Sequence, residues 1–235
     1  MKKGLLLILL TACVAGIGFA KSLDTGYEPE GLDELAKQKG VFKTTLVRPD
    51  ADFSRYTKLH PRKVMLVVRD PGPQTTGKET GSLIGSRNRG GVMLEYEDLA
   101  ELKEVINETI VTELSCDSEL ELVHDSGPET LVLRAAVTDV VFDETSKIKT
   151  ADGEPAPVLS QGTIVFDLID GETGVIQARV GERRKCRPPK GGDSVDVNLG
   201  SWSSAAGWAQ LAVSDLCQEL KRVRGEGSGK GPHSS

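Results

Sequence analysis

Residues 162–184 read GTIVFDLIDGETGVIQARVGERR, and this stretch decides the fold that the sequence predicts. Two runs rich in β-branched residues, Gly162 to Ile169 and Val175 to Arg184, flank the five residues Asp170 to Gly174. A connection of this length that holds two glycines is typical of a β-hairpin with a longer loop. The core of the chain is therefore expected to contain an antiparallel sheet.

Three further strands are predicted outside this hairpin. Leu131 to Phe142 forms a long apolar run, and Glu119 to Val123 forms a short one after which Gly127-Pro128 turns the chain. Lys63 to Arg69 carries a continuous apolar run between two prolines, which predicts a strand buried on both faces.

Two helices complete the expected fold. Apolar residues recur at helical spacing from Leu99 to Leu114 and again from Trp202 to Val223. Ser201 is the natural N-cap of the second helix, and Gly225 follows its end. The order β-α-β-β-β-β-α predicts an α+β fold, a two-layer sandwich of a mostly antiparallel sheet with two helices packed on one face, as one domain over residues 45–224.

The N-terminus has the pattern of an export signal. A basic start, Met1 to Lys3, precedes an uncharged run of 16 residues, Leu5 to Ala20, which is shorter than the ~20 residues that span a bilayer. Gly18 and Ala20 are small residues at the positions that signal peptidase requires, so residues 1–20 are predicted as a signal peptide cleaved after Ala20.

A second processing route overlaps the first. The string Leu10-Thr11-Ala12-Cys13 resembles a lipobox, in which residues 1–12 are removed and Cys13 is lipidated. The run from Val14 to Ala20 stays apolar, which is typical of an ordinary signal peptide, so both routes remain open. Both routes export the protein. Residues 21–44 are then predicted as a polar tether and residues 225–235, which lack large apolar side chains, as a disordered tail.

Composition excludes several classes of protein. At 38% hydrophobic and 27% charged residues, the chain resembles an ordinary globular protein rather than a polytopic membrane protein or a disordered chain. A net charge of −6 and 4% aromatic residues argue against a nucleic-acid-binding protein. The chain has three His and four Cys and neither H-E-x-x-H nor C-x-x-C, so no metal site and no cofactor are expected.

No catalytic residue is predicted either. Gly72 to Lys78 fits the spacing of a phosphate-binding loop, but Glu79 stands where the Ser or Thr that holds Mg²⁺ is needed. His124, Asp125 and Ser126 are neighbours in sequence, which does not make a triad, because triads are assembled in space. His60 beside Pro61 has no recognisable catalytic context.

Cysteines and charged residues provide the remaining site predictions. Cys116, Cys186 and Cys217 stay in the processed chain, where a Cys186–Cys217 disulfide is favoured and the absence of any bridge is the alternative. Asp139 and Asp167 interrupt apolar strands, and they either pair with arginines such as Arg134 or Arg179 or point outward. A basic patch, suited to lipid headgroups, cell-wall material or an acidic partner, or else a merely solvated hairpin end, is predicted from Arg179, Arg183, Arg184, Lys185 and Arg187.

Three strings together carry a family resemblance: Pro49-Asp50-Ala51-Asp52-Phe53-Ser54-Arg55-Tyr56, Thr130 to Val140, and Asp170-Gly171-Glu172-Thr173-Gly174-Val175, followed by a helix that contains tryptophan. Residues 45–224 thereby resemble a family of Gram-negative envelope lipoproteins known only as domain of unknown function 3313. The resemblance implies an exported, often lipidated, small α+β domain without an assigned activity. This chain departs from the family in the glycine-rich stretch Gly72 to Gly91.

These observations predict a non-enzymatic envelope protein. It is expected in the periplasm or, if Cys13 is lipidated, anchored at the inner leaflet of the outer membrane. An envelope protein or a cell-wall component is the expected partner, nucleic acid is not, and the oligomeric state is left open. The alternative is a secreted hydrolase or carbohydrate-binding protein whose site forms only in three dimensions.

Overall fold

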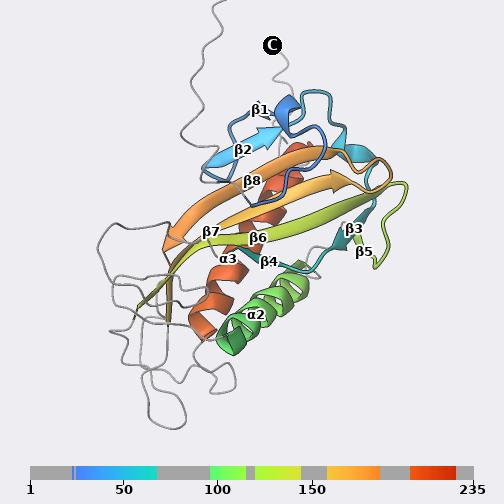
Figure 1. The fold of residues 1–235 in the computed structure, drawn as a ribbon. Helices are drawn as coiled ribbons and strands as arrows, with labels where there is room; N and C mark the ends of the chain where they lie inside the picture. The colour runs from blue at the N-terminus through green and yellow to red at the C-terminus, as the bar shows by residue number, and fades with distance from the viewer. Residues whose placement is uncertain are drawn as a thin grey trace, which may run out of the picture.

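The computed structural model describes residues 23, 25–67, 96–114, 120–143, 158–185 and 202–225. This part of the chain forms an eight-stranded sheet and two long helices (Figure 1). Their bounds, with two short 3₁₀ turns, are η2 (Leu32–Glu34), β1 (Ala36–Lys37), β2 (Thr44–Val47), η3 (Phe53–Arg55), β3 (Lys58–Pro61), β4 (Met65–Val67), α2 (Tyr96–Leu114), β5 (Glu121–Leu122), β6 (Thr130–Asp143), β7 (Val158–Asp170), β8 (Ile176–Lys185) and α3 (Ser203–Val223).

The sheet is built around the predicted hairpin, which is confirmed as β7 and β8. The strand order is β1-β2-β8-β7-β6-β3-β5, and β4 also pairs with β6. Along β1, β2, β8, β7 and β6, each strand is antiparallel to its neighbour, whereas β3 and β4 run parallel to β6. The prediction of a mostly antiparallel sheet is therefore confirmed.

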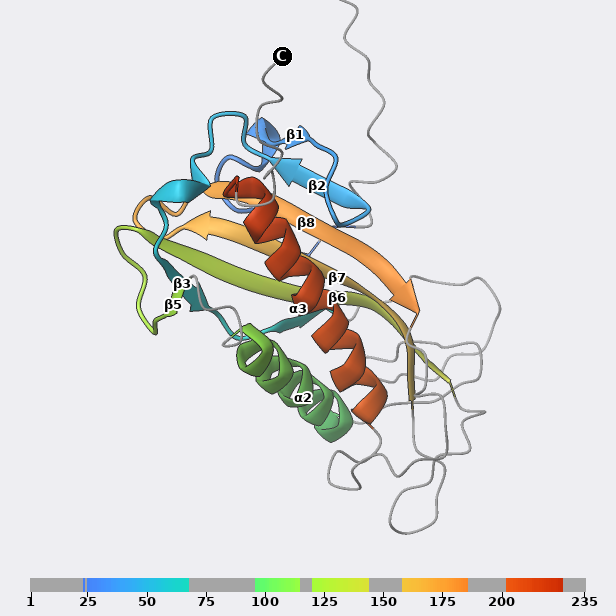
Figure 2. The same cartoon turned by 180° about the vertical axis from the view of Figure 1, so that it is seen from behind.

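Both long helices lie on one face of this sheet, as predicted (Figure 2). The buried face of α3 is rich in alanine, which lets the helix approach β7 closely, and Trp208 packs over Gly162 of that strand. Side chains alternate along β7, so Ile164, Phe166 and Leu168 join the helices in the main core. These contacts give the two-layer α+β architecture.

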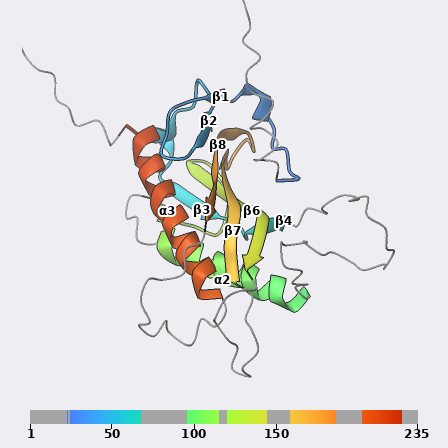
Figure 3. The same cartoon turned by 90° about the vertical axis from the view of Figure 1, so that its left-hand side faces the viewer.

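The opposite face of the sheet is covered in part by the N-terminal segment, defined as Leu23 and residues 25–35. Leu23 and Thr25 are both 3% exposed, and a Cβ on Gly181 of β8 would lie 2.8 Å from Leu23 Cδ2. Further along, Leu32 and Leu35 pack on a second apolar cluster formed by Val132, Ile169 and Ile176. Figure 3 shows the blue N-terminal segment and the red helix α3 on opposite sides of the sheet.

Several sequence predictions are corrected by these contacts. Residues 21–44, predicted as a polar tether, contain buried Leu23 and Phe42 as well as strand β1. Strand β4 is half-buried rather than buried on both faces, because it pairs with the middle of β6 at the edge of the described sheet. The N-cap of α3 is Trp202, without a side-chain cap, instead of Ser201, whereas Gly225 adopts the positive φ expected just beyond the helix.

Strands β1, β2 and β3 are additions to the predicted order. They are two to four residues long and carry few apolar residues, so no alternating pattern develops in them. Strand β6 also bends, because a bulge after Thr138 places Asp139 at φ 51°. In the part of the chain that the structure describes, neither helix is long and apolar enough to cross a membrane.

Removing the first part of the N-terminal segment should destabilise the domain. A chain that starts at Glu28 lacks buried Leu23 and the backbone carbonyl groups that bind Arg179, and should lose about 3 kcal/mol of unfolding free energy relative to a chain that starts at Lys21. Urea denaturation followed by circular dichroism measures the difference. As a control, removal of residues 229–235 from the predicted tail should change it by less than ~0.5 kcal/mol. Equal stability of the two N-terminal variants would contradict the docking of this segment.

Candidate functional site

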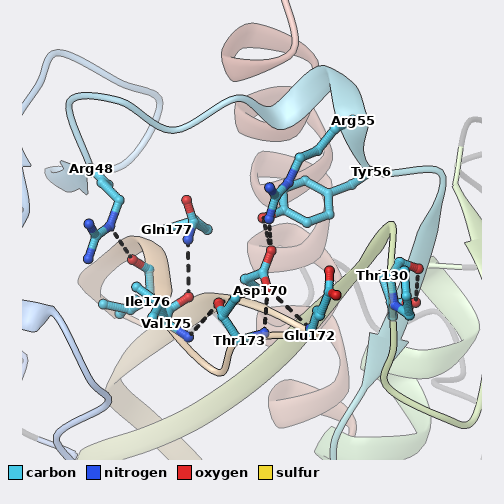
Figure 4. Close-up of polar contacts among 11 residues, drawn as sticks. Arg48, Arg55, Tyr56, Thr130, Asp170, Glu172, Thr173, Val175, Ile176 and Gln177 are labelled. Carbon is cyan, nitrogen blue, oxygen red and sulfur yellow. Dashed lines mark hydrogen bonds and ion pairs between the residues drawn. The ribbon is translucent and has the colours of Figure 1, made fainter.

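The carboxylate of Asp170 organises one end of the sheet. Asp170 is the last residue of β7 and is 2% exposed. Its Oδ1 accepts hydrogen bonds from the backbone N–H groups of Glu172 (3.1 Å) and Thr173 (2.7 Å) and from Thr173 Oγ1 (2.8 Å) (Figure 4). An aspartate that caps its own turn in this way fixes the connection between β7 and β8.

The second oxygen of the same carboxylate ties a distant segment to the turn. Asp170 Oδ2 accepts a hydrogen bond of 2.8 Å from the Tyr56 hydroxyl and forms an ion pair with Arg55. Burial raises the pKa of the Tyr56 hydroxyl above its usual range, although Arg55 partly opposes the rise, so the hydroxyl remains a donor at neutral pH. Both Asp170 oxygens are thus occupied by internal partners, and the carboxylate is unsuited to act as a general base.

The three strings that carry the family resemblance meet at this point. Tyr56 belongs to the first string and Asp170 to the third, and Gly171 donates its N–H to the carbonyl oxygen of Thr130, which begins the second (2.9 Å). A Cβ on Gly171 would lie only 2.7 Å from that oxygen, so glycine is required for the approach. These strings therefore share a structural role, which is to hold one end of the sheet together.

A pocket of about 120 Å³ opens next to this junction. It lies on the sheet face away from the helices, because Val132 of β6 and Ile169 of β7 belong to the cluster under the N-terminal segment. Its lining consists of Tyr27, Arg62, Ser126, Val132, Arg134, Ile169, Asp170, Gly171 and Gly174. The lining residues thus combine apolar Val132 and Ile169 with two arginines, one serine, one tyrosine and the Asp170 carboxylate.

A row of charged side chains crosses the same face of the sheet. Arg179 on β8 pairs in register with Asp167 on β7, which in turn pairs with Arg134 on β6. Arg179 binds the Asp167 carboxylate with both Nε (2.6 Å) and Nη2 (2.9 Å), and the two residues are 4% and 1% exposed. Of the options left open for Asp167, the structure selects the pair with Arg179.

Arg179 also holds the N-terminal segment. Its Nη1 and Nη2 donate to the carbonyl oxygens of Leu23 (3.4 Å) and Tyr27 (3.2 Å). The Asp167 carboxylate binds Arg179 and not Arg134. Arg134 lies over the Tyr27 ring, with 3.2 Å between the guanidinium carbon and the ring centroid. Tyr27 is therefore fixed against the sheet as a wall of the pocket.

Arg62 brings the second guanidinium group to the pocket. It directly follows β3, and its backbone N–H donates to the carbonyl oxygen of Leu133, which places it beside this part of β6 (2.8 Å). Arg62 is exposed and Arg134 is half-buried. Within the described residues, neither guanidinium group forms an ion pair with a carboxylate.

The predicted basic patch does not form one surface. Arg179 and Arg184 point to opposite faces of β8, because successive side chains alternate. Arg179 is buried against Asp167, and Arg184 forms ion pairs with Glu182 and with Asp215 of α3. Only Arg183 and Lys185 are exposed members of the described part of the patch, and Arg187 lies outside the described residues.

The other predicted site residues do not gather at the pocket. His60 contacts the carbonyl oxygen of Val123 through Nδ1 (3.0 Å), and His124 is exposed before the turn into β6. Asp139 lies in the β6 bulge and accepts hydrogen bonds from Thr138 and Thr163. Among the described residues, no group of three His, Cys, Asp or Glu side chains could hold a metal ion.

Several predictions concern residues that the structure does not describe. Cys217 is half-buried in α3, but the disulfide predicted with Cys186 cannot be compared with the structure, since Cys186 lies outside the described residues. The same holds for Cys13, Ala20, Cys116 and the stretch Gly72 to Lys78. The lipidation, cleavage and disulfide predictions therefore stay predictions.

Sequence reasoning missed the pocket itself. Tyr27 lies in the stretch that is predicted as a tether. Arg62 lies between Pro61 and Lys63, in a sequence that matches no motif. Arg134 is predicted only as a possible partner of Asp139 or Asp167, Ser126 only as a neighbour of His124, and Asp170, Gly171 and Gly174 only as part of a string of the family resemblance. A charged residue within an apolar run, such as Arg134, is a sequence signal that points to this face of the sheet.

No family model matches the chain, and no curated protein matches it, so the resemblance to domain of unknown function 3313 stays a prediction. Among solved structures, similarity is found to the PelC dodecamer of Paraburkholderia phytofirmans, at 12% identity over 79% of this chain and 95% of that one, with a TM-score of 0.32. A Xanthomonas campestris protein of family DUF330 gives 10% identity, 72% and 88% coverage and a TM-score of 0.38. A putative neuraminyllactose-binding hemagglutinin homologue from Helicobacter pylori is 10% identical, over 73% of this chain and 87% of that one, with a TM-score of 0.32. Scores and identities this low support no conclusion about the function of this chain.

The buried ion pair should dominate the stability of the charged row. Arg179→Met leaves Asp167 buried without its partner and should lower the unfolding free energy by about 3–5 kcal/mol. Arg183→Met is the matched control, because Arg183 is exposed on the same strand and its loss should cost less than ~0.5 kcal/mol. Equal effects of the two substitutions in urea denaturation would show that the pair contributes nothing specific.

The Asp170 junction should behave as a structural unit. Asp170→Ala removes the side-chain acceptor of three hydrogen bonds in the turn and the acceptor of the Tyr56 hydroxyl, so the unfolding free energy should fall by about 3 kcal/mol, whereas Tyr56→Phe should cost about 1 kcal/mol. Glu172→Ala, in the same turn but with an exposed side chain, serves as the control and should have little effect. Thermal denaturation ranks the three variants, and a Glu172→Ala effect as large as that of Asp170→Ala would refute the assignment.

Proposed function

We propose that this chain is an exported envelope protein whose α+β domain binds a partner without transforming it. The observation that carries the proposal is the way the chain enters the domain. Leu23 is buried on the sheet and bound to Arg179, only three residues after the predicted cleavage site at Ala20. Either predicted processing product, starting at Lys21 or at Cys13, therefore keeps every residue that the described fold uses.

This position also constrains an anchored form. If Cys13 carries lipid, nine residues lie between it and Leu23, and the ten extended Cα–Cα steps span at most about 35 Å. The domain of an anchored protein would thus stay close to the membrane surface, as expected for a periplasmic lipoprotein at the inner leaflet of the outer membrane. The resemblance to domain of unknown function 3313 implies the same class of protein.

The described pocket favours binding over the alternative of hydrolysis. Glycoside hydrolysis uses two carboxyl groups on either side of the scissile bond, whereas the lining of this pocket holds one carboxylate, Asp170, whose oxygens are both engaged. Neither His60 nor His124 lines it. Guanidinium, hydroxyl and aromatic groups around an apolar floor are typical of recognition.

The test is the intact mass of the protein purified from the cells that make it, combined with labelled-palmitate incorporation. We expect either a chain starting at Lys21 or a lipidated chain starting at Cys13, recovered in the envelope fraction. In the lipidated case Cys13→Ala should abolish the label, and Cys217→Ala, the control for loss of a thiol, should retain it. An unprocessed chain that keeps Met1 and stays in the cytoplasm would overturn the proposal.

A further inference from the structure

We infer that the pocket between Tyr27, Arg62 and Arg134 is a binding site for an organic carboxylate. The inference rests on the proposed function as a binding domain and names the chemistry that the domain recognises. Three features of the described residues support it: the charge sequence across the sheet, the arrangement of donors around the pocket, and the size and polarity of the space.

The charged row is incomplete at the pocket. Across the sheet it runs from Arg179 to Asp167 to Arg134, and Arg62 follows beside Arg134. Both oxygens of Asp167 are taken by Arg179, so the only carboxylate in the row neutralises the guanidinium at its far end. Two like charges, exposed Arg62 and half-buried Arg134, therefore line one pocket, and an anion bound between them would relieve their repulsion.

The donors around the pocket suit a planar anion. A guanidinium group presents a rigid fork of N–H donors that matches the two oxygens of a carboxylate. The Tyr27 ring, against which Arg134 stacks at 3.2 Å, fixes the plane of that fork before any ligand arrives. Ser126 adds a hydroxyl group to the lining, and Gly171 and Gly174 contribute no side chains to it.

Size and polarity restrict the rest of the ligand. A volume of about 120 Å³ corresponds to roughly four water molecules at ~30 Å³ each, well below the ~300 Å³ of sites that enclose whole ligands. Only a terminal group with a short carbon chain fits, and Val132 and Ile169 offer it an apolar floor.

A carboxylate suits this space better than a phosphate does. The Asp170 carboxylate also lines the pocket, and it repels a dianion more strongly than a monoanion. Its charge is compensated by the ion pair with Arg55, so a single negative charge is tolerated beside it. The site therefore fits the carboxylate end of a peptide chain or a small free carboxylic acid.

The binding test uses the chain from Lys21 to Ser235, labelled with ¹⁵N, at constant ionic strength. It is titrated with trialanine, with trialanine amide, with sodium propionate and with inorganic phosphate, while the backbone amide signals of Ser126, Gly171 and Gly174 are followed. Trialanine or propionate should shift these signals with a dissociation constant on the order of 1 mM. Saturation by trialanine identifies a chain end as the source of the carboxylate, and saturation by propionate alone identifies a small acid.

Four variants, one of them a control outside the pocket, link this binding to the pocket. Arg62→Gln, at an exposed position that should not affect folding, and Arg134→Gln should each weaken carboxylate binding at least ~10-fold. Arg183→Gln removes the same charge from the same sheet face outside the pocket and should leave binding unchanged. Arg134→Lys, which keeps the charge but loses the fork, should bind with intermediate affinity.

The inference is overturned if trialanine amide binds as well as trialanine, if phosphate binds more tightly than the carboxylates, if Arg183→Gln weakens binding as much as Arg62→Gln, or if no probe shifts the signals. Failure here is distinguishable from failure of the proposed function. The titration uses purified protein and leaves processing and location untouched, whereas intact mass and fractionation test those alone.

Discussion

Strands β6, β7 and β8 are largely buried on both faces, and this constraint shapes the rest of the domain. One face is covered by α2 and α3, whose alanine-rich and leucine-rich surfaces need only apolar side chains opposite them. The other face carries charged residues, among them Asp167 and Arg179, which must be paired once they are covered. The N-terminal segment provides that cover, and Arg179 binds it through the carbonyl oxygens of Leu23 and Tyr27.

The sequence predicts the sheet and its helical cover well, but it predicts the cover of the opposite face by the N-terminal segment poorly, for a physical reason. The hairpin and the helices show in the spacing of apolar side chains, because burial selects those side chains directly. The N-terminal segment is held in part through backbone carbonyl groups, which every residue possesses, and its few buried apolar residues lie too far apart in a polar stretch to form a pattern. A polar tether was therefore the natural prediction for residues 21–44.

Charged residues on strands show the same limit. Arg179 and Arg184 are both basic residues of β8, and sequence proximity suggested a shared patch with Arg183. Because side chains alternate along the strand, the two arginines lie on opposite faces of the sheet. Arg179 forms an ion pair with Asp167, and Arg184 forms one with Asp215. Which partner an aspartate selects, as Asp167 selects Arg179 over Arg134, depends on register and side-chain reach that the sequence does not contain.

Tyr27 connects the N-terminal segment to the pocket. Its carbonyl oxygen accepts a hydrogen bond from Arg179, and its ring lies against Arg134, so one residue belongs both to the N-terminal segment and to the wall of the candidate site. Displacing Leu23 and residues 25–27 from the sheet would remove this wall and expose Arg134 to water. The docking of the N-terminal segment and the shape of the pocket are thus coupled through Tyr27, Arg134 and Arg179.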